Sequence, residues 1–322
     1  MASNGIHFLG GSHLADGETL TELAQFTEKT GFDGMSVADH VAGGPQGFWD
    51  PLLGMSWIAA VTERLEVLSC VLVLPLTHPV RVARQAADLD ILSNGRGILA
   101  VGVGGEDVKE FEAGGVPVHE RGARTNEYIE VIKGLWTEEK FTYDGRWFQY
   151  KDITFGPKPS SKPYPRLWVG GRLGGVETGP DGQRRFKSRT AAVRRAAKYG
   201  NGWFPNHMTP EQFKESIDML KTFTKEYGRE NVPFTYCQNT SVVLTDSVEE
   251  SLAEVAGKMR YGETRNDTFA LKYDILGSPK DCIKRIREYV DIGVTYFNCG
   301  FGVKNRRKRM ERFAKEVIPY FK

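Results

Sequence analysis

Short apolar runs alternate with helix-like segments through the first half of the chain. The runs carry β-branched residues without helical spacing, which predicts buried strands at 5–9, 32–38, 65–74 and 98–103. Between them, apolar residues recur at helical spacing, which predicts helices over 18–29, 52–62 and 79–92. Each strand is apolar on both faces, and this is typical of a parallel sheet covered by helices.

The second half of the chain continues the alternation with larger excursions. Further strands are predicted at 167–169, 202–204, 234–244 and 295–299. The helices between them span 120–136, 191–200, 210–227, 279–291 and 304–321, with another beginning at Val248. Eight strands without a break in composition favour an α/β fold, a single-domain (β/α)8 TIM barrel over 1–322. Alternation around Asp144-Gly145 predicts a hairpin excursion at about 139–165, and a polar insertion occupies about 172–188.

Composition and charge mainly exclude classes of function. With 322 residues, of which 40% are hydrophobic, the chain can bury a barrel-sized core. A net charge of +2 gives no support to nucleic-acid or membrane-surface binding, and no apolar run approaches the length of a membrane span. Four scattered cysteines without a C-x-x-C pair indicate a reducing compartment. Because the N-terminus also lacks a signal sequence, we expect a cytoplasmic protein.

In a (β/α)8 barrel the reactive groups lie where the strands end. The residues at the predicted ends are His7, Asp39-His40, Ser69-Cys70, Gly104-Gly105-Glu106, Gly170-Gly171-Arg172, Asn206-His207, Asn239 and Asn298. This set lacks the carboxylate pair of a glycosidase, the spacing of metal ligands and the G-x-S-x-G nucleophile elbow of a hydrolase. It fits a planar cofactor held by backbone contacts, with one acid–base group beside it and no metal.

The stretch 95–122 joins a predicted strand to glycines and acids. Gly102, Gly104 and Gly105 would let a flat or phosphorylated ligand approach the backbone where a Cβ would collide. The acids from Glu106 to Glu110 are better explained as capping residues in the first turn of a helix. The match to the G-x-G-x-x-G dinucleotide fingerprint is weak.

Histidine and aromatic residues supply further candidates. A single histidine after a strand is more often a hydrogen-bonded loop residue than a catalyst, and the neighbouring Asp39 could simply cap a helix, so His40 depends on its context. Aromatic side chains suggest an apolar, ring-containing substrate, although they are as often part of the core. The predicted substrate pocket consists of His7, Trp49, Trp203 and His207.

Two basic segments remain. The helix start Ser188-Arg189-Thr190 follows a strand end closely, which is typical of an anion site and equally of a mobile surface lid. The run 304–309 lies among apolar residues, so it is interpreted as the solvated face of the closing helix rather than as a nucleic-acid site.

Six stretches together carry a family resemblance: GFDGMSVADHV (31–41), the segment 78–124, WTEEKFTYDGRWFQY (136–150), PRLWVGG (165–171), AAKYGNGWFP (196–205) and GSPKDCIKRIREYVDIGVTYF (277–297). They resemble the bacterial luciferase-like flavin and deazaflavin oxidoreductases over essentially the whole chain, and most closely the F420-dependent branch. The resemblance implies a barrel that binds reduced coenzyme F420 or FMN at the carboxyl ends of its strands. It also implies a homodimer.

The resemblance also assigns roles to residues. An Asp-His pair at the end of the second strand meets the ring system in the F420-using branch, and here that pair is Asp39 and His40, with His40 as the acid–base or ring-polarising group. The family often has a cis peptide after the third strand, which would fall near Ser69-Cys70-Val71 beside the ring. The other implied contacts are Gly104, Gly105 and Glu106 at the ring or ribityl chain, and Gly170, Gly171, Ser188, Arg189 and Thr190 at the phosphate.

Three functions are open at this point. The first is an F420-dependent oxidoreductase that transfers a hydride between reduced deazaflavin and a small organic substrate. The second is an FMN-dependent monooxygenase supplied by a separate cofactor reductase. The third is a barrel without catalysis that binds a ligand, against which the intact Asp39-His40 pair argues.

Overall fold

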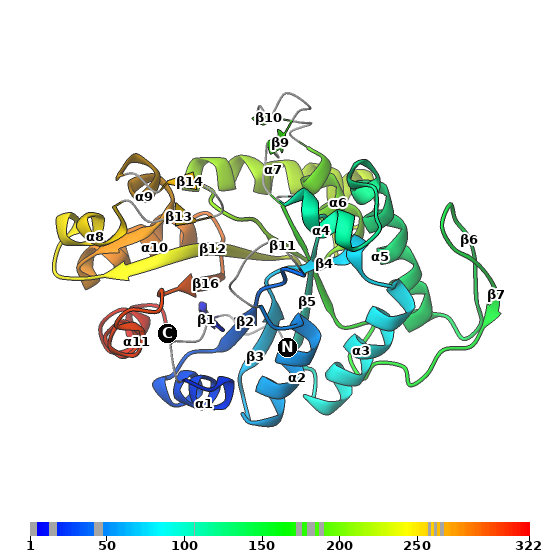
Figure 1. Ribbon diagram of the computed structural model, residues 1–322, viewed down its shortest axis with the longest axis horizontal. Helices are drawn as coiled ribbons and strands as arrows, with labels where there is room; N and C mark the ends of the chain where they lie inside the picture. Colours follow the sequence, from blue (N-terminus) through cyan, green and yellow to red (C-terminus); the bar gives the residue numbers. More distant parts are fainter. Residues whose placement is uncertain are drawn as a thin grey trace.

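The computed structural model describes residues 5–12, 18–41, 48–105, 107–171, 176–178, 184–186, 190–256, 259–260, 263–264 and 267–322. Within these ranges eight parallel strands close into a barrel surrounded by helices, which confirms the predicted TIM barrel (Figure 1). The barrel strands are β1 (His7–Gly11), β2 (Gly34–Val37), β3 (Glu66–Ser69), β5 (Gly97–Gly102), β8 (Arg166–Gly170), β11 (Gly202–Phe204), β12 (Thr235–Leu244) and β16 (Tyr296–Gly300). The ring closes where Gly202 of β11 lies opposite Thr235 of β12.

Most of the helices lie close to the positions that apolar spacing predicts, whereas the helix over 267–273 was not predicted. The helices are α1 (Leu20–Thr30), α2 (Pro51–Ala60), α3 (Pro79–Leu92), α4 (Val108–Ala113), α5 (Arg121–Thr137), α6 (Ala191–Tyr199), α7 (Pro210–Glu226), α8 (Val248–Val255), α9 (Asp267–Tyr273), α10 (Pro279–Val290) and α11 (Arg306–Glu316). Local chemistry sets their ends: Thr19 and Glu22 form a capping box at the start of α1, and Gly31 ends it with φ of 96°. The closing helix α11 packs beside α1 (Figure 1). None of the helices in the described ranges is long and apolar enough to cross a membrane.

Several shorter strands lie outside the ring of eight barrel strands. The predicted hairpin is present as β6 (Phe141–Asp144) antiparallel to β7 (Gln149–Ile153), and it extends beyond α3 and α5 (Figure 1). Within the polar insertion, β9 (Val176–Thr178) pairs with β10 (Arg184–Phe186). The pair β13 (Met259–Arg260) and β14 (Glu263–Thr264) and the strand β15 (Ile275–Gly277) were not predicted, because runs of two or three residues leave no periodicity in a sequence.

The third barrel strand is interrupted, which corrects the prediction of one continuous strand over 65–74. After β3 the peptide bond Cys70–Val71 is cis, at the place that the family resemblance indicates, and pairing resumes in β4 (Leu72–Val73). Leu68 lies opposite Ile98 of β5, but Leu72 lies opposite Val101. Four residues along the third strand therefore span the same distance as three along β5. The extra residue interrupts the hydrogen bonding between the two strands. The apolar run alone could not reveal this, because the residues on both sides of the interruption are apolar in the same way as the rest of the strand.

Side chains of the barrel strands alternate between two apolar layers. One face of each strand packs under the helices, and the other fills the interior of the barrel with Leu9, Leu68, Ile98, Ala100, Trp168, Phe204, Cys237 and Tyr296. The interior is thus closed by packed side chains, and a ligand can enter only at an end of the barrel.

Candidate active site at the carboxyl end of the barrel

Polar side chains replace apolar ones where the strands reach the carboxyl end of the barrel. Cys237 of β12 and Tyr296 of β16 fill the interior. Two residues further along the same strands, and therefore on the same face, stand Asn239 and Asn298, and Cys70 follows β3 at the same opening. The mouth of the barrel is thus lined by groups that donate and accept hydrogen bonds.

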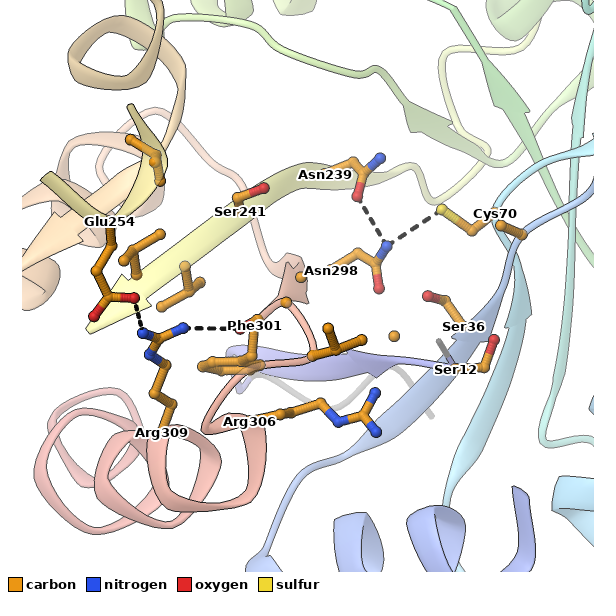
Figure 2. Close-up of a pocket in the computed structure, with 18 residues that line it drawn as sticks. Ser12, Ser36, Cys70, Asn239, Ser241, Glu254, Asn298, Phe301, Arg306 and Arg309 are labelled. Carbon is orange, nitrogen blue, oxygen red and sulfur yellow. Dashed lines mark hydrogen bonds and ion pairs between the residues drawn. The ribbon is translucent and has the colours of Figure 1, made fainter. Parts of the chain in front are cut away.

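Asn298 links Asn239 and Cys70 through hydrogen bonds of its side-chain amide. Its Nδ2 donates to Oδ1 of Asn239 at 2.9 Å and contacts Sγ of Cys70 at 3.3 Å (Figure 2). Asn239 in turn donates to Oδ1 of Asn206 at 3.2 Å. The side-chain oxygen Oδ1 of Asn298 is buried, and among the described residues it has no hydrogen-bond partner. Because a buried acceptor without a partner costs free energy, this oxygen marks a position where a donor from a ligand would be stabilised.

A cavity of about 280 Å³ opens from this polar layer. It extends from Cys70 and Asn298 past Ser12 and Ser36 to the first residues of α11 (Figure 2). Its far end is lined by Arg306 and by other residues of α11 and of the loop before it. The cavity therefore combines uncharged polar groups at the barrel mouth with two guanidinium groups, Arg306 and Arg309, and the carboxylate of Glu254 at the opposite end.

Asp39 is buried directly after β2. Its Oδ2 accepts the backbone N–H of Val73 at 2.8 Å, so the carboxylate ties the end of β2 to β4. Burial raises the pKa of Asp39 to about 6, although the bond from Val73 acts in the opposite direction, and the charges of Asp50 and Glu110 raise it further. A carboxyl group that exchanges a proton near neutral pH thus lies beside the mouth.

His40 follows Asp39 and meets a second buried acid. Its Nδ1 lies 3.2 Å from Oε1 of Glu110, on the short helix α4, and its ring lies 4.8 Å from that of Phe48. Glu110 is almost fully buried, so it is not the exposed helix-capping acid that the sequence indicated. Asp107 has that role instead, since its side chain accepts the N–H of Lys109. The acid fixes the orientation of the imidazole.

The glycines at the strand ends are required by contacts within the protein. A Cβ at Gly102 would lie 2.5 Å from Val71, and a Cβ at Gly104 would lie 2.5 Å from Val73. Gly170 also packs against Val71. These contacts place Val71 and Val73, and with them Asp39, on the same rim as Gly104 and Gly170. They also show that the glycines by themselves do not indicate a ligand, because neighbouring side chains already occupy the space that a Cβ would need.

Two arginines that the sequence did not single out lie near one another, Arg121 beside Gly105 and Arg195 beside Gly122. A Cβ at Gly105 would lie 2.8 Å from the guanidinium of Arg121, and Arg195 of α6 donates to Oδ1 of Asn126 on the neighbouring α5 at 2.7 Å. Burial lowers the pKa of Arg195 to about 10, and the charge of Arg121 contributes in the same direction. Two cations held together in this way form a position that favours an anion.

The start of α6 lies against the end of β8. A Cβ at Gly171, where φ is 119°, would lie 2.8 Å from Cβ of Ala192 in the first turn of α6. Thr190 precedes this helix without a side-chain capping bond. The structure thus brings Gly170, Gly171 and Thr190 together. Ser188, Arg189 and Glu106, which the resemblance also implied as cofactor contacts, lie outside the described residues.

Comparison with known proteins identifies the family of this barrel. A model of the luciferase-like monooxygenases matches residues 6–176 and 187–296. The chain belongs to the luciferase-like monooxygenase family. This confirms the resemblance drawn from the sequence.

Relatives in the family include users of both cofactors. The chain is 26% identical to an FMNH2-dependent dimethylsulfone monooxygenase of Pseudomonas putida, over 92% of this chain and 86% of the relative. It is 26% identical to an F420-dependent glucose-6-phosphate dehydrogenase of Intrasporangium calvum, over 91% of each. Among solved structures, an F420-dependent secondary alcohol dehydrogenase in complex with an F420-acetone adduct superposes with a TM-score of 0.77 at 18% identity, covering 97% of this chain and 98% of that one. That likeness supports the fold.

In this member of the family, His7 lies at the wrong end of the barrel for the predicted substrate pocket. It is the first residue of β1, its ring stacks on Tyr296 at 4.2 Å, and its Nδ1 lies 3.3 Å from Glu66. Glu66 begins β3 and pairs with Arg166, which begins β8. His7 therefore belongs to a charged cluster at the amino end of the barrel. The prediction failed because the strand begins at His7 rather than ending just after it.

The side chains of Trp203 and Ser69 are buried and bonded within the protein. Trp203 is fully buried under the helices, where its ring packs edge-on against Phe213 and its Nε1 donates to the carbonyl of Gly171. Ser69 is fully buried, and its hydroxyl bonds to the backbone of Ala100 in β5. Neither side chain is available to a ligand, so the predicted substrate contact of the Trp203 ring is wrong. The cofactor contact at Ser69 was predicted for the bulge beside the cis peptide, and it stays a prediction.

The other predicted pocket residues lie at the carboxyl end. Trp49 is half exposed, next to Phe48 and the start of α2, and His207 is buried with its ring edge-on to Phe269 at 5.0 Å. Their role in binding stays a prediction. Across the described ranges, no group of three or more His, Cys, Asp or Glu side chains is arranged to hold a metal ion.

The basic run 304–309 is not a wholly solvated face. Arg306 is 5% exposed and Arg309 is 9% exposed, and both line the cavity. Each is held by an acid, Arg306 by Glu18 and Arg309 by Glu254. The sequence does not reveal this burial. Arginine is rarely buried unless it is paired, and the acids that pair with these two arginines lie far away along the chain.

Proposed function

We propose that the protein is an F420-dependent oxidoreductase that transfers a hydride between reduced deazaflavin and a small organic substrate. The observation that carries the proposal is the Asp39-His40 pair, held by Val73 and Glu110 on the rim that also contains Gly104 and Gly170. The F420-dependent relative that spans 91% of the chain supports it.

The residues at the mouth fit such a cofactor. The side-chain oxygen Oδ1 of Asn298, which no donor of the described residues occupies, would accept a ring N–H, and Cys70 and Val71 would face the ring. Gly171, Thr190 and the arginine pair Arg121 and Arg195 would hold the phosphate, because backbone N–H groups at a helix start and paired cations both favour an anion. When bound, the deazaflavin supplies the hydride, and the protein supplies positions and protons.

The chain's own groups divide that work. Glu110 fixes the ring of His40, the group that would hold or move a proton at the substrate side. Asp39, whose pKa burial raises to about 6, keeps the end of β2 and β4 together beside His40. The packed interior beneath the mouth excludes water from one side of the site. This arrangement suits positioning with one acid–base group.

The test is a pair of binding titrations on the purified protein, with F420 and with FMN. The proposal expects saturable F420 binding that is weakened in a Thr190→Ala variant and unchanged in a Thr222→Ala variant, whose hydroxyl lies on the exposed α7. Tight FMN binding without F420 binding would refute it. Unchanged turnover of a His40→Ala variant across a substrate panel would instead support a barrel that binds a ligand without catalysis.

An FMN-dependent two-component monooxygenase is the second candidate. It is favoured by the Pseudomonas putida relative, which matches 92% of the chain. This function would require a separate reductase to supply the reduced flavin. Oxygen consumption that depends on both FMN and an added flavin reductase would distinguish it, because hydride transfer from F420 needs neither.

A further inference from the structure

The cavity beside the polar layer has the size of a small molecule. Its volume is about 280 Å³, near the lower end of the range of about 300 to 1,000 Å³ that is typical of small-molecule sites. Its lining includes none of Gly171, Arg121 and Arg195, where the proposed function puts the ribityl phosphate. The cavity is therefore suited to the organic substrate, and its lining indicates the chemistry of that substrate.

One end of the cavity contains a buried cation with an unused donor. Arg306 is 95% buried, since its exposed fraction is 5%, and Glu18 pairs with its Nη2. Its Nε is buried and has no hydrogen-bond partner among the described residues. The second arginine of the lining differs, because Arg309 is engaged by Glu254 and by the carbonyl oxygens of Phe301 and Lys304. Arg306 is thus the lining cation with a donor left over.

The surroundings of Arg306 also favour negative charge. Its guanidinium reaches from α11 toward Ser12 and Ser36, whose hydroxyls line the same space (Figure 2). Arg306 is the first residue of α11, and the preceding Asn305 makes no side-chain capping bond, so the positive end of the helix is not neutralised by its own cap. The loops after the seventh and eighth strands of TIM barrels often bind anionic groups, and β12 and β16 are those strands here.

We propose that this cavity binds an organic anion, with its oxyanion group at Arg306 and its uncharged part toward the barrel mouth. The guanidinium then orients the molecule, and the uncharged part reaches the place where the proposed function puts the cofactor ring. The identification of this anion as the substrate rests on the proposed function. The existence of the binding site does not.

Binding without any cofactor tests the site directly. Isothermal titration calorimetry would compare benzoate and phenylphosphonate with benzamide, which has the shape of benzoate but no charge. We expect both anions to bind and benzamide to bind more weakly. In Arg306→Gln, anion binding should fall about tenfold or more, because a charge-assisted pair is lost.

Arg307→Gln is the matched control. Arg307 is adjacent on the same helix and contacts the same Glu18 at 3.0 Å, but it is exposed and does not line the cavity. Its variant should bind benzoate as the wild type does. Equal losses in both variants would mean that only the surface charge matters, and would overturn the proposal.

A second variant keeps the test valid if Arg306→Gln does not fold. Val303 is half exposed at the edge of the cavity, so Val303→Trp should block it without removing a buried group. Loss of benzoate binding is the expected result. Wild-type affinity in this variant, or no binding of either anion to the wild type, would overturn the proposal. Because none of these measurements involves F420 or FMN, a failed cofactor titration and a failed anion site remain distinguishable.

Discussion

Nδ1 of His40 lies 3.2 Å from Oε1 of Glu110, although 70 positions separate the two residues in the chain. Glu110 is almost fully buried, while His40 keeps part of its ring at the rim. A buried acid that holds one ring nitrogen leaves the other nitrogen in a defined direction. Glu110 is therefore a positioning residue for the proposed acid–base group.

This pair yields a graded prediction. We expect His40→Asn to lower kcat about 100-fold or more, because general acid–base catalysis typically contributes that much. Glu110→Gln should lower kcat by a smaller factor and change the pH profile of the reaction, while KM for the cofactor stays constant. Steady-state kinetics over a range of pH would measure both. The control is His119→Asn, at an exposed position. A Glu110→Gln enzyme that only unfolds more easily, with an unchanged pH profile, would show a purely structural role.

The buried carboxyl group of Asp39 predicts a pH-dependent stability. Its pKa is raised from 3.8 to about 6, so ionisation is penalised in the folded state. The neutral form of Asp39 stabilises the folded state relative to the ionised form. This contribution is fully present below pH 3.8 and is lost as the pH rises through about 6. The difference corresponds to about 3 kcal/mol. Asp39→Asn, which keeps an acceptor for Val73, should therefore be more stable than the wild type at pH 8 and equal to it near pH 4.

Urea unfolding at both pH values would measure this difference. Asp218→Asn, in an exposed ion pair with Lys214, should change stability by less than about 1 kcal/mol at either pH. If Asp39→Asn were less stable than the wild type at pH 8, the carboxylate would be contributing to the fold instead of opposing it. A gain in stability with a loss of turnover would be typical of a residue retained for function.

Sequence periodicity was sufficient for the barrel but not for its reactive end. The eight barrel strands were predicted because each is apolar on both faces, and α3 was predicted to the residue because Pro79 marks its start. Where a strand ends is harder to predict, since one apolar run can continue past the last ladder bond. That error merged β3 with β4, and a misjudged strand start placed His7 at the mouth.

The parts of the site that the sequence did not reveal depend on distant contacts. Glu110 resembles a helix cap until the fold buries it against His40. Trp203 and Phe204 are adjacent, but only Phe204 faces the interior, and the sequence does not say which. Arg306 looks solvated until Glu18, 288 positions away, covers it. Burial of charge is a property of tertiary structure, so no local pattern predicts it.

The charged cluster at the amino end of the barrel should affect stability and not catalysis. Burial raises the pKa of Glu66, but the bond from His7 and the charge of Arg166 outweigh it, and the pKa lies below its ordinary value. Its contribution to stability is therefore present at neutral pH and lost as the pH falls below 4.5. Glu66→Gln should cost about 2 kcal/mol at pH 7, with kcat/KM unchanged.

Thermal or urea unfolding combined with activity assays would check this. The comparison is Glu226→Gln, which removes an exposed ion pair with Arg194 and should cost less than about 1 kcal/mol. A large loss of activity in folded Glu66→Gln protein would contradict the assignment of this cluster, and of His7 with it, to the amino end.

Gly104 offers a test of the packing that forms the rim. Gly104 and Gly115 both have positive φ, 59° and 65°, so alanine at either position costs about 1 to 2 kcal/mol in backbone energy. A Cβ at Gly115 has nothing within 4 Å, whereas a Cβ at Gly104 would lie 2.5 Å from Val73. Gly104→Ala should therefore be less stable than Gly115→Ala by about 1 to 3 kcal/mol, as measured by urea unfolding. Equal losses would mean that β4 shifts freely, and then Val73 could not hold Asp39 in a fixed position beside His40.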